Sequence, residues 1–192
     1  MAVAMADGKL DKSEGVAIKS WATKMVESCD EDQREARKSL INGAMRAAHQ
    51  AAMNGSLSLD TAIEELNEIG QKSPKYETVK LCFDVMAADG VADPAELQMI
   101  RSISDRLNLD FTEVERMRDS AVLQLDASIS GQASLEDMLG IDPSWDRTRI
   151  QRHIEDEFIK WNSRLGTLRN SDDRAQAQYM IDLCSKAAAK YG

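Results

Sequence analysis

Two segments of this chain align with each other without a gap, at an offset of 82 residues. Residues 3–26 match residues 85–108, and eight of the 24 paired positions are identical. The shared core reads Ala-Asp-Gly-x-x-Asp-x-x-Glu, starting at Ala6 in the first copy and at Ala88 in the second. A duplicated segment of this kind is one supersecondary unit used twice. The repeat therefore predicts two related hairpins.

The residues within each copy predict a helix, a tight turn and a second helix. The sequence Asp-Pro-Ala-Glu at 93–96 is a strong helix start, because Asp suits the N-cap, Pro the first helical position and Glu the third. Asp11 and Glu14 repeat the capping pair in the first copy. The Asp-Gly before each start favours the end of the preceding helix, since Gly adopts the left-handed cap conformation readily.

Composition and patterning predict an all-α fold. The 192 residues include only three Pro and ten Gly, and aromatic residues make up 5%, too few for a typical β-sandwich. Helical spacing of apolar residues predicts six or seven helices before residue 125. Residues 126–134 are small and polar, as in a linker. We therefore predict a helical domain at 1–125, a linker at 126–134 and a helical module at 135–192.

The charge balance restricts the partners and the compartment. The chain has a net charge of −9, and its acidic excess lies on the first 140 residues, which argues against nucleic-acid binding and favours cations or basic protein surfaces. No apolar run reaches the roughly 18 residues that span a membrane. Cys29, Cys82 and Cys184 are scattered, as expected in a reducing cytoplasm. We predict a cytoplasmic protein with an unidentified protein partner, and homo-oligomerisation stays open.

Carboxylates gather in both copies of the repeat. Three fall within eight residues each time: Asp7, Asp11 and Glu14, then Asp89, Asp93 and Glu96. Oxygen ligands of this kind suit Ca²⁺ or Mg²⁺, and packing of the repeats face to face would bring all six together. The alternative is helix capping alone, in which each Asp N-cap contributes about 1 kcal/mol. Capping leaves Asp7 and Asp89 unexplained, so these two should matter most in a metal site.

The motifs of common enzymes are missing from the sequence. It contains no nucleophile elbow, no Gly-rich phosphate loop and no Cys/His cluster. His49 and His153 stand alone and are interpreted as surface or boundary residues. We therefore predict a protein that is not an enzyme. The rival hypothesis is a metal-dependent hydrolase that uses the clustered carboxylates.

The duplicated Ala-Asp-Gly-x-x-Asp-x-x-Glu hairpin resembles the TerB family of tellurite-resistance and stress proteins, over roughly residues 1–125. The resemblance implies an all-helical fold with pseudo-twofold repeats, a metal-linked stress role and no established catalytic reaction. The same hairpin occurs in DjlA-type membrane-anchored co-chaperones, so a co-chaperone fragment is a further alternative. Only six residues precede Asp7. The first hairpin should therefore have a short first helix, as in a chain that is truncated or that starts differently.

Residues 135–192 resemble a J domain, in the order that DjlA-type proteins use. The match consists of Leu-Gly-Ile at 139–141, Pro143, and a helix that opens near Ile150 and ends at Trp161. The family places His-Pro-Asp next, whereas this chain has Asn-Ser-Arg at 162–164. The resemblance thus implies a J-like hairpin that does not activate a heat-shock chaperone and serves as a docking or stabilising appendage. An unrelated helical hairpin is the alternative.

The last two helices are expected to pack through one apolar stripe each. The inward side chains predicted from helical spacing are Ile150, Ile154, Phe158 and Trp161, against Tyr179, Leu183 and Ala187.

Overall fold

The computed structural model describes residues 1–6, 10–125 and 134–192, and the regular structure within these ranges is entirely helical, which confirms the all-α prediction. Three short 3₁₀ turns are η1 (Val3–Met5), η2 (Glu31–Gln33) and η3 (Ala87–Asp89). The α-helices are α1 (Lys12–Glu27), α2 (Arg34–Met53), α3 (Leu59–Ile69), α4 (Lys72–Met86), α5 (Pro94–Arg106), α6 (Phe111–Val122), α7 (Leu135–Leu139), α8 (Arg147–Leu165) and α9 (Ser171–Tyr191).

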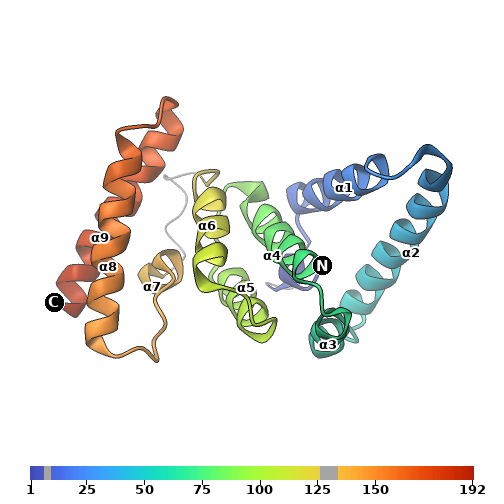
Figure 1. Ribbon diagram of the computed structural model, residues 1–192, viewed down its shortest axis with the longest axis horizontal. Helices are drawn as coiled ribbons and strands as arrows, with labels where there is room; N and C mark the ends of the chain where they lie inside the picture. The colour runs from blue at the N-terminus through green and yellow to red at the C-terminus, as the bar shows by residue number, and fades with distance from the viewer. Residues whose placement is uncertain (7–9, 126–133) are drawn as a thin grey trace.

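The helices form a row from one end of the molecule to the other (Figure 1). Helices α8 and α9 lie side by side at the C-terminal end, with α7 between them and the central helices α4, α5 and α6. Helices α1 and α2 diverge from the turn that joins them and form a V at the opposite end. The two hairpins of the sequence repeat therefore occupy different surroundings.

The predicted caps are present at both repeat helices. The Asp11 side chain accepts a hydrogen bond from the Ser13 amide at 2.9 Å, and Asp93 accepts one from the Ala95 amide at 2.7 Å. Gly90 ends η3 with φ of 82°, in the left-handed region predicted for it. Ahead of the motif, the second copy has the whole of α4, whereas the first copy has only η1.

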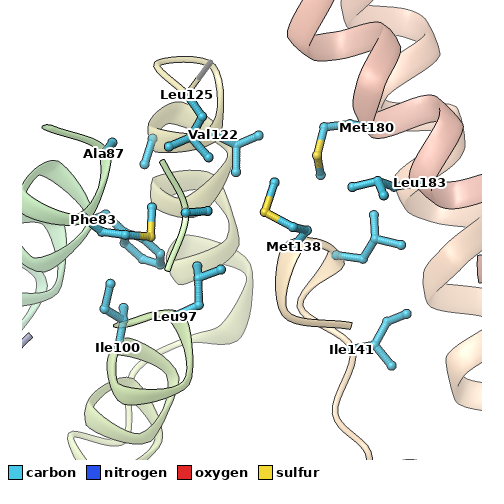
Figure 2. Packing of buried hydrophobic residues seen from close by; sticks show 14 of the residues in the cluster. Phe83, Ala87, Leu97, Ile100, Val122, Leu125, Met138, Ile141, Met180 and Leu183 are labelled. Carbon is cyan, nitrogen blue, oxygen red and sulfur yellow. The ribbon is translucent and has the colours of Figure 1, made fainter. Parts of the chain in front are cut away.

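One hydrophobic core joins the central helices to the C-terminal helices. Figure 2 shows Phe83 and Ile100 on one side of this core and Met138, Ile141 and Met180 on the other. All five are buried in a single cluster of contacting residues. Burial of each large apolar side chain stabilises the fold by about 1.5–3 kcal/mol. The C-terminal helices therefore rest on the repeat body. The predicted linker falls on residues 126–133, outside the described residues, and on Ser134, which caps α7.

The end of α8 differs from the sequence prediction. The helix was expected to end near Trp161, but it continues to Leu165, so residues 162–164 form its last turn and the connection to α9 is short. The cause is a tertiary contact. Arg164 pairs with Asp119 at 3.2 Å and its guanidinium lies 5.0 Å from the centre of the Trp161 ring. Arg164 makes both contacts from the last turn of α8.

The inward face of α8 was also predicted in part wrongly. Ile150, Ile154 and Trp161 are buried as expected, but Phe158 is 40% exposed. Glu157 is buried in its place, because this carboxylate faces cations from α6 and from its own helix. Charge pairing between helices, which a hydrophobic pattern does not encode, decided which residue faces inward.

Candidate functional site

The two repeat motifs meet at Glu14 and Glu96. Each is only 6% exposed, although each lies in the first turn of a helix. Their carboxyl groups hydrogen-bond to each other, and burial is the main reason that the pKa of Glu96 is raised to about 8. The negative charges of Glu14, Asp93 and Asp89 raise this pKa further. The structure thus brings four of the predicted carboxylates into one electrostatic neighbourhood.

The remaining contacts of the motif residues are local. The Asp11 amide donates to Glu14 Oε2 at 2.6 Å, which completes the predicted capping box. Asp93 Oδ1 accepts from the Glu96 amide at 3.3 Å, in addition to its cap of Ala95. Asp89 Oδ1 accepts from the Val91 amide at 2.8 Å. Asp89 therefore stabilises the turn that follows η3, and Asp7 lies outside the described residues.

A second cluster of charges, which the sequence reasoning missed, joins α6 to α8. The Asp119 carboxylate is buried and lies 3.0 Å from Arg118 Nη2, 2.9 Å from Lys160 Nζ and 3.2 Å from Arg164 Nη1. Arg118 Nη2 also lies 3.1 Å from Glu157 Oε1, and the Trp161 indole donates to Glu157 Oε2 at 3.0 Å. We call Arg118, Asp119, Glu157, Lys160 and Arg164 the α6–α8 ion network. The sequence contained a weak indication of this network, because charged residues replace apolar ones on the inward face of both helices.

His153 is partly buried, which agrees with the prediction of a surface or boundary residue. Its ring contacts the rings of Trp145, at 5.1 Å between centroids, and Phe111, at 6.1 Å, and Nε2 lies 2.7 Å from the Leu139 carbonyl oxygen. Burial lowers the pKa of His153. His49 is exposed, as predicted. The aromatic contacts come from residues far apart in the sequence, so they could not be seen along the chain.

Within residues 1–6, 10–125 and 134–192, one trio of metal-ligand groups lies within 4.8 Å of one another, namely Glu115, His153 and Glu157. Two of these residues already have other partners. Arg118 and Lys160 contact Glu157, and His153 contacts the Leu139 carbonyl oxygen. A cation would have to displace two positive charges. We therefore interpret the trio as part of the interface between α6 and α8.

Glu115 at the edge of the network makes stability depend on pH. Burial raises its pKa to about 7, against the opposing effect of Arg118. A raised folded-state pKa contributes stability that is full below the unfolded value near 4.5 and is lost as the pH rises to about 7. Glu115→Gln cannot ionise at this position. We therefore expect the melting temperature of this variant, relative to that of the wild type, to be higher at pH 8 than at pH 5. Thermal melts at both pH values measure this difference.

The control for this prediction is Glu113→Gln, at an exposed position on the same helix. Its melting temperature relative to wild type should be the same at pH 5 and pH 8. A Glu115→Gln difference that does not change with pH would contradict the prediction.

The fold and the paired carboxylates define an all-helical domain built from two acidic-turn repeats. The chain belongs to the TerB family, since the family model described as tellurite resistance protein TerB matches residues 1–119, more than half of the chain. Membership supports a tellurite-resistance-like, non-enzymatic role at the level of the family. No curated protein and no solved structure matches. The J-like interpretation of residues 135–192 lies beyond the family match and stays a prediction. Among the described helices, none has the length and apolar character to cross a membrane.

Proposed function

We propose that this chain is a non-enzymatic scaffold of a stress response, in which a divalent cation, Ca²⁺ or Mg²⁺, bound between the two repeat motifs fixes the helical body. The observation that carries the proposal is the buried, hydrogen-bonded pair of Glu14 and Glu96, one from each repeat. Two carboxyl groups in hydrogen-bond contact need a proton between them. A hard cation that accepts oxygen ligands would replace this proton.

The position of the pair explains how a cation would support a scaffold. Glu14 lies in the first turn of α1 and Glu96 in the first turn of α5, so an ion held by both would connect the two hairpins. Asp93 and Asp89 add negative charge to the same neighbourhood. Such an ion stabilises an arrangement of helices without acting on a substrate. No observation on the described residues favours the hydrolase alternative.

Metal addition provides the test. We expect Ca²⁺ or Mg²⁺ to raise the melting temperature of the chain, because a ligand that binds only the folded state stabilises it by mass action. At a concentration one hundred times Kd the stabilisation is about 2.7 kcal/mol, or roughly 5–10 °C for a chain of this size. Differential scanning calorimetry with each metal and with chelator measures the shift.

Glu96→Gln should abolish the metal-dependent shift without lowering the melting temperature in chelator, because the amide removes a ligand and a buried acid together. Glu113→Gln, the same change in the first turn of α6, is the matched control and should keep the full shift. If Glu96→Gln retained the shift, or if millimolar metal produced neither heat nor stabilisation, the motif would be left with helix capping alone.

A further inference from the structure

An apolar groove runs between α1, α2 and α4. It has a volume of about 500 Å³ and is lined by Ile18, Trp21 and Met25 of α1, by Met45 of α2 and by Leu81 of α4, among others. A second hollow of about 470 Å³ shares Ile18 and Met45 and continues along α2 toward its C-terminal end. These two hollows, taken together, are the α1–α2 groove. It lies where Figure 1 shows the V of the two helices.

The second repeat shows what a surface of this kind packs against. Trp21 and Met25 are partly exposed in the groove, whereas their repeat counterparts, Ile103 and Leu107, are only 4% and 1% exposed. Those counterparts lie in one hydrophobic cluster with Val79 and Phe83 of α4, and α4 packs along α5. An amphipathic helix therefore covers the second copy of this surface. The first copy has apolar residues at the same positions, and α2 and α4 pack against α1, yet Trp21 and Met25 stay partly exposed.

Helix α2 is largely unburied. Ile41 is its one buried residue, while Leu40 and Met53 are 66% and 65% exposed. Methionine side chains supply much of the groove wall, and their flexibility lets one surface fit different apolar partners. The groove therefore has the composition of a surface that adapts to a helix.

The charges around the groove select the kind of helix. Arg37, Arg46 and Lys19 lie on its lining, against the single acidic residue Glu77. This basic excess stands out in a chain with a net charge of −9. Complementary charge guides association and disfavours wrong partners. An occupant with acidic flanks fits the rim, and one with basic flanks does not.

We propose that the α1–α2 groove binds an amphipathic helix with acidic flanks, supplied by a partner protein. The partner helix would place apolar side chains at a spacing of three or four residues into the groove and its carboxylates on the basic rim. This partner site deepens the proposed scaffold role and rests on it. Its test needs no metal, so failure of the metal proposal and failure of this one are distinguishable.

The test uses a labelled helical peptide of about 18 residues, long enough to hold a helix. Its apolar stripe copies the Val79, Phe83 and Met86 spacing of α4, and its outward positions are Glu in one version and Lys in the other. Fluorescence anisotropy with the whole chain in chelator measures binding. We expect the Glu peptide to bind about tenfold more tightly than the Lys peptide, with the difference shrinking at high salt.

The double charge reversal Arg37→Glu with Arg46→Glu should weaken the Glu peptide about tenfold and strengthen the Lys peptide. Lys38→Glu, an exposed change on α2 outside the groove lining, is the matched control. Equal binding of both peptides, or binding that the reversal leaves unchanged, would overturn the proposal. Sedimentation that shows a dimer lost in the double variant would also overturn it and assign the groove to a second copy of the chain. Thermal melts verify that each variant is folded.

Discussion

Asp119→Ala is expected to lower the free energy of unfolding by about 3–5 kcal/mol, because it removes a buried carboxylate that three cations share, among them the buried Arg118. Asp119 contacts Arg118, Lys160 and Arg164 within 3.2 Å, and its side chain is 2% exposed. For a chain of this size the melting temperature should fall by roughly 6–20 °C. Urea unfolding followed by circular dichroism gives the free energy directly.

Glu113→Ala is the matched control for the Asp119 prediction. Glu113 pairs with Arg116 at 2.7 Å on the same helix, but both side chains are exposed, so the pair contributes at most about 1 kcal/mol. A loss for Asp119→Ala as small as that for Glu113→Ala would mean that the α6–α8 ion network does not hold the C-terminal helices to the body.

Gly140→Ala is expected to cost about 3 kcal/mol or more, for two reasons that add. Gly140 has φ of 68°, where an L side chain costs roughly 1–2 kcal/mol. A Cβ atom at this position would also lie 1.9 Å from Arg118 Nη1. Arg118 cannot move freely, because Asp119 and Glu157 hold it in the buried network, and disturbing such pairs costs a further kcal/mol or two, roughly.

Gly70→Ala separates the two contributions. Gly70 ends α3 with φ of 72°, and the nearest atom to its added Cβ would be the Glu68 carbonyl oxygen at 3.9 Å. This variant should therefore show the backbone cost alone, about 1–2 kcal/mol. Equal losses of unfolding free energy for Gly140→Ala and Gly70→Ala would show that Arg118 can move away from the added Cβ without a loss of stability.

Local chemistry made much of the fold predictable. A cap such as Asp11 or Asp93 acts on amides two or three residues away, so its effect is written in adjacent sequence. The same holds for Gly90, which acts within its own turn. The repeat, at an offset of 82 residues, also predicted that two distant segments would have related structures. The carboxylates that it singled out include the pair that meets in the structure.

The tertiary structure decided what each side chain faces. The hydrogen bond between Glu14 and Glu96 joins two helices that only packing brings together. In the same way, Asp119 of α6 contacts cations of α8, some 40 residues further along the chain, and Arg118 of α6 pairs with Glu157, which is buried while Phe158 is exposed. Periodicity assigns apolar residues to a buried face, but it contains no information on which charges will neutralise one another. Caps were therefore predictable from the sequence, whereas the acidic pair, the ion network and the uncovered α1–α2 groove depended on the packing of distant helices.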